Sequence, residues 1–335
     1  MDRLSRRQVV QGVGVAALGV VTGCGQLPWQ PPPRQVARIG FLASAVPASS
    51  PLAEAFRQGL REHGWVEGQN LLIEYRFGDG SDDTAFLTEL AVELVRHPVD
   101  IIVAAGEIGA QAARDATSTV PVVMTLHSDP VGTQLVASLA RPGGNVTGLS
   151  TMGTQLSAKR LELLKDAVPG LTRVAVLWAP ISPATMVAFD DTRLASQRLQ
   201  VQLQSLEANS LDALEAAFAT ALRERAEALI TLQTVFNLAQ RTRIAELAVS
   251  SRLPSMHPFS EYAAAGGLLA YGANRADLYR RGAAYVDKIL RGAPPANLPV
   301  EQPTTFDFII NLQTAQALGL TIPPHVLLQA TEVIQ

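Results

Sequence analysis

Five positions near the ends of predicted strands in the first half of the chain carry groups suited to a charged small ligand. The carboxylates of Glu107 and Asp129 could pair with a ligand ammonium group. The Ser44 hydroxyl, with the backbone N–H that follows it at Ala45, could bind a carboxylate. Gly106 ends a predicted strand and opens a helix, where unpaired N–H groups and the helix dipole attract anions. These residues predict a site that holds a small molecule by its charges.

Several of these positions also have a structural interpretation, which stays open. Ser44 suits the cap of the helix that follows it, and Gly106 suits a tight turn that needs glycine. Glu107 suits a solvated residue in a first helical turn, and Asp129 suits a turn before Pro130. The residue types alone do not separate the two interpretations.

Three further candidates come from the second half of the chain. Ala179 and Gln233 directly follow predicted strands. Tyr271 lies at a strand end, where its ring could stack on a planar ligand or pack in the core. Ligands of open α/β sheets bind beyond the carboxyl ends of the strands, so both halves are expected to line one cleft.

The motifs of common enzyme classes are missing from the sequence. It has no Gly-x-x-x-x-Gly-Lys-Ser/Thr loop for nucleotide phosphates and no Gly-x-Ser-x-Gly elbow for a serine nucleophile. Its five histidines lack the paired spacing of a metal site. A net charge of −3 gives no electrostatic reason to expect nucleic acid. We therefore expect a binding protein with no catalytic residues, cofactor or metal, and an enzyme using Glu107 and Asp129 is the alternative.

Residues 1–23 predict an export signal. Arg6 and Arg7 precede an apolar stretch and small residues, as in a signal peptide, and the stretch is too short to span a membrane. Ser5–Val10 also resembles a twin-arginine export motif, and the general export route is the alternative.

The single cysteine, Cys24, predicts lipid attachment. Val21-Thr22-Gly23-Cys24 is similar to a bacterial lipobox, in which the chain is cut before the cysteine and lipid is added to it. The lipidated chain would then have no thiol left for disulfides, metal ligation or catalysis. Residues 24–35 are rich in proline, which predicts a stiff spacer between the lipid and the folded part.

Apolar strands alternate with helical segments from residue 37 onward. The predicted strands are 37–42, 71–76, 100–105, 121–126, 173–178, 200–206 and 228–232. The predicted helices are 52–64, 83–96, 106–116, 184–199, 211–225, 240–250 and 277–291. Strands without a polar face are typical of parallel sheets that helices cover on both sides. The predicted fold class is α/β, with two doubly wound parallel-sheet lobes and an interlobe cleft.

A set of motifs is spread over residues 36–335. They are Gly64–Asn70, Asp129–Val131, Ser138–Gly148, Gly266–Gly272, Ala284–Gly292, Leu298–Thr304, Asn311–Ala315 and Leu318–Leu320. Together they resemble the ABC transporter substrate-binding family that is often described as a tryptophan/tyrosine transport component.

The resemblance implies a type I periplasmic-binding fold, in which the chain passes between two lobes three times. The passages are expected near Gly148, near Tyr271–Ala273 and near Pro299, and helix 277–291 is expected to return to the first lobe. The implied parts are a signal peptide (1–23), a lipidated spacer (24–35), an N-terminal lobe (36–148 plus 273–298) and a C-terminal lobe (149–272 plus 299–335).

The implied function is that of a monomeric, lipid-anchored substrate-binding protein of an ABC importer. It would stay in the periplasm or at the cell-envelope surface and capture a small polar or aromatic, amino-acid-like solute in a cleft that closes by a hinge. Its expected partners are that small molecule, the ABC permease and ATPase subunits, and the membrane through its lipid. A ligand sensor or partner-presenting lipoprotein without transport is the alternative.

Overall fold

The structure, a computed structural model, describes residues 36–44, 48–80 and 83–335. The predicted signal peptide, Cys24 with its spacer, and Ala45 lie outside the described residues. Within the described ranges, no helix is both long and apolar enough to cross a membrane.

Five parallel strands form a first sheet in the order β2-β1-β3-β4-β5. The strands are β1 (Ala37–Ala43), β2 (Leu71–Phe77), β3 (Ile101–Ala105), β4 (Val122–His127) and β5 (Val146–Ser150). All residues of β3, β4 and β5 are buried. Their continuous apolar runs therefore reflect a sheet that is covered on both faces.

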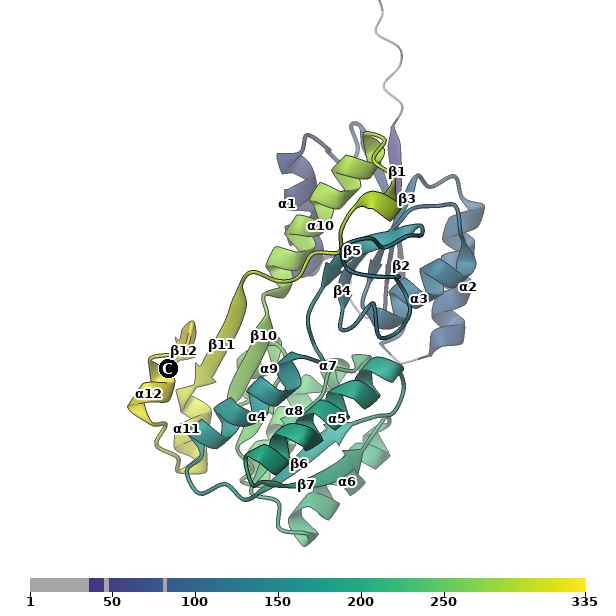
Figure 1. Ribbon diagram of the computed structural model, residues 1–335. Helices are drawn as coiled ribbons and strands as arrows, with labels where there is room; N and C mark the ends of the chain where they lie inside the picture. Colours follow the sequence, from purple (N-terminus) through teal and green to yellow (C-terminus); the bar gives the residue numbers. More distant parts are fainter. Residues whose placement is uncertain (1–35, 45–47, 81–82) are drawn as a thin grey trace, which may run out of the picture. The chain divides into compact units, whose positions relative to one another are not determined.

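Four helices cover the first sheet, two on each face (Figure 1). They are α1 (Pro51–Glu62) and α10 (Arg275–Leu290) on one face, and α2 (Thr84–Arg96) and α3 (Glu107–Ala116) on the other. On the first of these faces the ring of Phe41 lies 5.6 Å from the Phe56 ring and 6.3 Å from the Tyr279 ring, measured between centroids. Aromatic contacts thus join β1, α1 and α10 in one core.

Helix α10 is distant from α1 in sequence but packs closely against it. At Gly59 of α1, a Cβ atom would lie 2.3 Å from the Arg280 carbonyl oxygen, so only glycine permits this approach. The Trp65 indole N–H also donates to Asp287 Oδ1 over 2.9 Å. Residues 275–290 are therefore part of the packing around the first sheet.

Seven strands form a second sheet in the order β12-β11-β10-β9-β8-β6-β7. They are β6 (Arg173–Trp178), β7 (Gln202–Glu207), β8 (Ala228–Thr231), β9 (Ser255–His257), β10 (Leu269–Ala273), β11 (Phe306–Asn311) and β12 (Glu332–Ile334). The β10–β11 pair is antiparallel and the other pairs are parallel. The second sheet is therefore mostly parallel, which confirms the predicted α/β fold class, and the β10–β11 pair is its antiparallel exception. After β10 the chain forms α10 beside the first sheet and then returns. β11 therefore starts next to the end of β10 and runs in the opposite direction.

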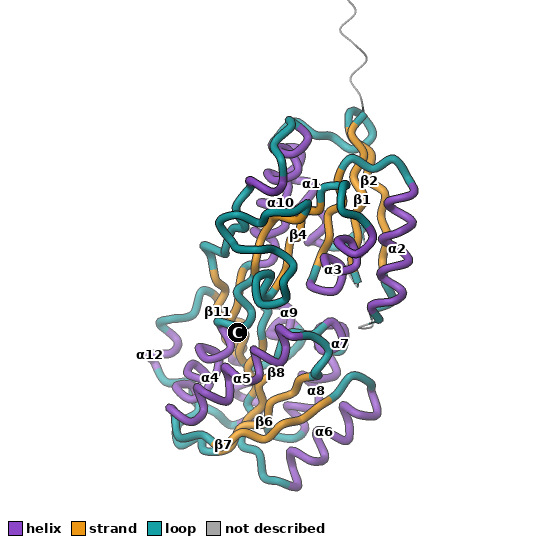
Figure 2. The backbone as a smooth tube through the Cα atoms, turned by 45° about the vertical axis from the view of Figure 1, so that its right-hand side comes forward, coloured by secondary structure: helices purple, strands orange, loops and turns teal. Residues whose placement is uncertain are grey.

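Helices also surround the second sheet, as Figure 2 shows. They are α4 (Leu156–Ala167), α5 (Pro183–Arg198), α6 (Leu211–Arg223), α7 (Val235–Ala239), α8 (Arg241–Ser250), α9 (Ser260–Ala264), α11 (Leu312–Leu318) and α12 (Pro324–Leu327). A short 3₁₀ helix, η1 (Pro295–Asn297), follows α10.

The chain leaves the first sheet after β5, returns to it after β10 and leaves it again before β11. Beside the first passage, Glu301 forms a parallel bridge with Leu149 of β5. The buried side chain of Arg160 on α4 donates from Nε to the Tyr271 carbonyl (2.8 Å) and from Nη1 to the Gly153 carbonyl (3.2 Å). One arginine thus links the segment after β5 to the strand that precedes α10.

Candidate ligand-binding cavity

A cavity of about 540 Å³ is lined by residues that accompany both sheets. Ser44 follows β1 and Gly106 follows β3, while Gln233 and Phe259 follow β8 and β9 by two residues. The cavity therefore lies beyond the carboxyl ends of parallel strands, where open α/β sheets place their ligands. Its volume is within the range of small-molecule sites.

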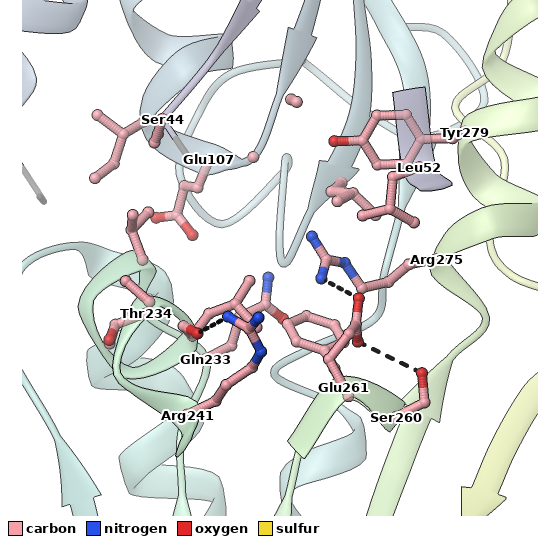
Figure 3. Close-up of a pocket in the computed structure, with 18 of the residues that line it drawn as sticks. Ser44, Leu52, Glu107, Gln233, Thr234, Arg241, Ser260, Glu261, Arg275 and Tyr279 are labelled. Atoms are coloured by element: carbon pink, nitrogen blue, oxygen red, sulfur yellow. Dashed lines mark hydrogen bonds and ion pairs between the residues drawn. The ribbon is translucent and has the colours of Figure 1, made fainter. Parts of the chain in front are cut away.

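Four of the predicted site residues meet on the wall of this cavity: Ser44, Gly106, Glu107 and Gln233. Figure 3 shows Glu107 beside Ser44, with its carboxyl group toward the loop that carries Gln233 and Thr234. Gly106 has a φ of 87°, a left-handed conformation that favours glycine, and serves as the N-cap of α3. This turn places Glu107 as the first residue of α3, at the positive end of the helix dipole.

Asp129, Ala179 and Tyr271 are not among the described residues that line the cavity. Asp129 accepts a hydrogen bond from the Gly132 N–H over 2.8 Å, as a turn residue does. Ala179 is buried. Tyr271 packs its ring against Phe306 and Phe308 of β11, with centroid distances of 6.2 and 6.0 Å. The pairing of β10 with β11 therefore provides Tyr271 with a core position.

Glu107 combines strong burial with incomplete hydrogen bonding. Its Oε2 accepts the Ser128 hydroxyl over 2.6 Å, whereas its buried Oε1 has no hydrogen-bond partner in the described part of the chain. Burial raises the pKa of the Glu107 carboxyl above its usual value, and the nearby Asp129 carboxylate adds to the rise. The hydroxyls of Ser128 and Ser182 act in the opposite direction.

An ion pair that the sequence pattern did not predict lines the other side of the cavity. Arg275 Nη1 lies 2.5 Å from Glu261 Oε1, and the Arg275 guanidinium stands over the Phe259 ring, 4.8 Å from its centroid. Arg275 is 7% exposed, and its Nε has no hydrogen-bond partner among the described residues. The available signal was Asn274, a good N-cap residue that α10 uses as such. The predicted helix began at Asp277 and therefore left Arg275 outside it.

Three other polar residues complete this side. The Asn274 amide nitrogen lies 3.0 and 3.2 Å from the two carboxylate oxygens of Asp307. Tyr279 is fully buried, and burial raises its pKa to about 12, so it stays protonated at neutral pH. Tyr279 lies on α10, Asn274 caps the start of α10 and Asp307 lies on β11, and the returning chain brings these elements together.

Comparison with known proteins gives a consistent result over nearly the whole described chain. A curated relative, the "Tyrosine-binding protein" of Clostridioides difficile (strain R20291), is 24% identical over 275 residues, which are 82% of this chain and 78% of the relative. A solved structure of a conserved domain protein from Vibrio cholerae is 27% identical, with a TM-score of 0.82. A Streptococcus pneumoniae ABC domain in complex with L-Trp is 25% identical, also with a TM-score of 0.82. Each of these two matches covers 89% of this chain and 99% of the other.

The family model "ABC transporter substrate binding protein" matches residues 45–334, which contain every strand of both sheets except β1. Members of this family are extracytoplasmic binding proteins and not enzymes. On the extent of that match, the chain belongs to the ABC transporter substrate-binding protein family.

Proposed function

We propose that this protein is the lipid-anchored receptor of an ABC importer and captures a small, amino-acid-like solute in the cavity described above. The permease and ATPase subunits of the transporter are its proposed partners, and a lipid at Cys24 ties it to the membrane as a monomer. The lobes proposed for closure are 36–148 with 273–298 and 149–272 with 299–335.

The observation that carries this proposal is the convergence of unpartnered polar atoms on one cavity. Ser44 Oγ, Glu107 Oε1 and Arg275 Nε are buried without hydrogen-bond partners within the described chain, and all three residues line the cavity. A buried polar atom without a partner costs about 1–3 kcal/mol, so a ligand that supplies partners would relieve this penalty. Hydroxyl, carboxylate and guanidinium groups together match the charges of a zwitterion.

Apolar side chains between these polar groups suit an uncharged ligand body. Leu52, Ile181, Val235 and Phe259 contribute to the cavity wall. A few placed polar groups on a mainly apolar wall are typical of small-molecule sites. The two amino-acid-binding relatives support an aromatic amino acid as the first candidate, because one is named for tyrosine and one was solved with L-Trp.

Ligand capture would favour a closed arrangement of the two proposed lobes. A ligand that contacts Glu107 from one side and Arg275 from the other binds the closed state more tightly, and only this difference in affinity shifts the equilibrium. The membrane subunits would recognise the closed state.

A thermal-shift panel tests the binding function. The purified protein is heated with amino acids, amines, nucleosides and small carboxylates, each far above the expected dissociation constant. A true ligand at 100 times its dissociation constant stabilises the folded state by about 2.7 kcal/mol and raises the melting temperature. An unchanged melting temperature with every class would refute the binding proposal.

A second experiment tests the anchor independently of the ligand. In the native host, Cys24→Ala is expected to move the protein from the membrane fraction to the unanchored extracytoplasmic fraction. A Cys24→Ala protein that remains fully with the membrane would contradict lipid attachment.

A further inference from the structure

Three carboxylates line the cavity, and they differ in the ion-pair and hydrogen-bond partners that the protein provides. Glu261 has the guanidinium of Arg275 at 2.5 Å. Asp307 accepts from the Asn274 amide over 3.0 and 3.2 Å. Glu107 has the Ser128 hydroxyl on Oε2 and the Ser182 hydroxyl near its carboxyl group, but no cation, and its Oε1 lacks a hydrogen-bond partner within the described residues. Of these three carboxylates, Glu107 is the least satisfied by the protein itself.

The charged group that acts on Glu107 is also negative, so it cannot compensate the charge of the Glu107 carboxylate. No Lys, Arg or His of the described chain forms an ion pair with Glu107, and the charge that acts on it is the carboxylate of Asp129. Asp129 also acts on Asp191 of α5, together with Asp190, so acidic groups accompany both sheets here. A buried carboxylate in such surroundings needs a cation or strong donors from outside the chain.

The position of Glu107 is fixed before any ligand arrives. The Ser128 hydrogen bond of 2.6 Å holds Oε2, while the buried Oε1 has no hydrogen-bond partner among the described residues. Ser44 is 6% exposed and its Oγ is unpartnered, so the Ser44 oxygen can accept a second N–H from the same ligand group. Ala43 pairs with Ala105, so Ser44 and Glu107 follow adjacent strands, and both line the cavity drawn in Figure 3. A primary ammonium group has three N–H donors and can satisfy both oxygens at once.

From this geometry we infer that Glu107 and Ser44 form a cation subsite, and that the ligand carries a protonated amine that this subsite binds. The inference rests on the proposed binding function and narrows its substrate class to cationic or zwitterionic solutes. Solutes that carry only a carboxylate are expected to bind more weakly, because they leave the Glu107 carboxylate without a cation. Glu107 is thus a specificity-determining residue.

Isothermal titration with three compounds of one shape tests this inference. L-Tryptophan carries both charges, tryptamine carries only the amine, and indole-3-propionate carries only the carboxylate. The protein is expected to bind tryptophan, or tryptamine, or both, and to bind indole-3-propionate at least about tenfold more weakly, a difference of about 1.4 kcal/mol. Binding of tryptophan but not tryptamine identifies an amino acid as the source of the ammonium, and the converse identifies a simple amine.

Glu107→Gln keeps the shape of the side chain and removes its charge. This variant is expected to lose at least about tenfold in affinity for the amine-bearing compounds while still binding them measurably. Glu215→Gln is the matched control, because Glu215 lies on α6, is exposed and pairs with Arg243 away from the cavity. The control is expected to keep the affinity of the original protein. Full affinity in Glu107→Gln would overturn the inference.

The remaining outcomes separate this inference from the function itself. If indole-3-propionate binds as tightly as the amines, the cation subsite is wrong and the binding function stands. If none of the indole compounds binds but another solute of the panel does, an uncharged or purely anionic solute overturns the inference and a cationic one supports it. If no solute of the panel binds, both proposals fail.

Discussion

Glu107 and Glu261 line one cavity, Glu107 from α3 beside the first sheet and Glu261 from α9 beside the second. Glu261 has an arginine partner of its own, whereas Glu107 has only neutral hydroxyl groups beside it. A paired carboxylate contributes to the structure whether or not a ligand is present. An unpaired buried carboxylate costs stability and is best explained by what it binds. We call the pair of Arg275 and Glu261 the supporting wall of the cavity, because these two residues compensate each other. We call Glu107 and Ser44 the recognising wall, because each has a polar atom without a partner among the described residues.

The largest effect is expected from breaking the supporting wall. Arg275→Met removes the ion pair with Glu261 and the contact with the Phe259 ring, and it leaves a partly buried carboxylate without its cation. The free energy of unfolding is expected to fall by about 3 kcal/mol, measured by urea denaturation.

The exposed pair of Arg243 and Glu215 provides the matched control for this change. Arg243→Met is expected to cost less than about 1 kcal/mol, because water and salt screen an exposed pair. Equal losses in the two variants would contradict the supporting role of Arg275.

A somewhat smaller effect is expected at Arg160, a buried cation that carbonyl oxygens satisfy. Burial lowers the pKa of Arg160 to about 10, so the side chain remains charged at neutral pH. Arg160→Met removes its hydrogen bonds to the Tyr271 and Gly153 carbonyls and is expected to cost about 2 kcal/mol in urea denaturation. Stability within about 0.5 kcal/mol of the original protein would show that these carbonyls find other partners.

The recognising wall predicts a pH dependence of ligand affinity. Burial raises the pKa of Glu107 in the free protein, and a bound ammonium would lower it again. Binding therefore releases a proton, and affinity for an amine is expected to rise with pH from the ordinary value of 4.5 upward until the free carboxyl is ionised. Titration calorimetry at a series of pH values measures this change.

The groups that face Glu107 set the controls for that experiment. They are the Ser128 and Ser182 hydroxyls, which do not titrate in this range, and the Asp129 carboxylate. Burial lowers the pKa of His127 to about 3, so this nearby histidine does not produce the expected change. In Glu107→Gln the pH dependence should vanish. A dependence that persists unchanged in this variant would assign it to another group.

The smallest effect concerns the stability of the unliganded protein. Because the pKa of Glu107 is raised by folding, its ionised form is unfavourable in the folded state at neutral pH, and this penalty disappears as pH falls through the folded-state pKa. Glu107→Gln is thus expected to raise the melting temperature at neutral pH, with a smaller gain under acidic conditions. Glu261→Gln should lower the melting temperature, because it weakens an existing pair. A fall for both variants would remove the distinction between the two walls.

Much of the fold could be predicted from local pattern. The strands 71–76, 100–105 and 173–178 differ from β2, β3 and β6 by one residue at most at each end. Helix α4 was missed, because its buried positions include Ser157 and Arg160 and so give no clean apolar stripe. β11 was missed as well, and with it the antiparallel pair and the core position of Tyr271.

The candidate site likewise contains residues that could be predicted from the sequence and residues that could not. Ser44, Gly106, Glu107 and Gln233 could be named because each closely follows a predicted strand, and parallel strands end at one edge. The pair of Arg275 and Glu261 could not be predicted. Its residues are 14 positions apart, Glu261 on the short helix α9 and Arg275 at the start of α10, and packing sets the directions of both helices. Arg275 reaches the cavity because α10 is held against α1 at Gly59.

The sequence by itself determined the alternation of strands and helices and the family, because both depend on local patterns of residues. It also determined the part of the cavity wall formed by residues that closely follow strands, which are Ser44, Gly106, Glu107 and Gln233. The tertiary structure decided which carboxylates are paired. Whether Glu107 or Glu261 has a cation depends on distances between segments that only the returning chain brings together. Charge compensation depends on the distances between charged groups in the folded chain, and the order of residues does not give those distances.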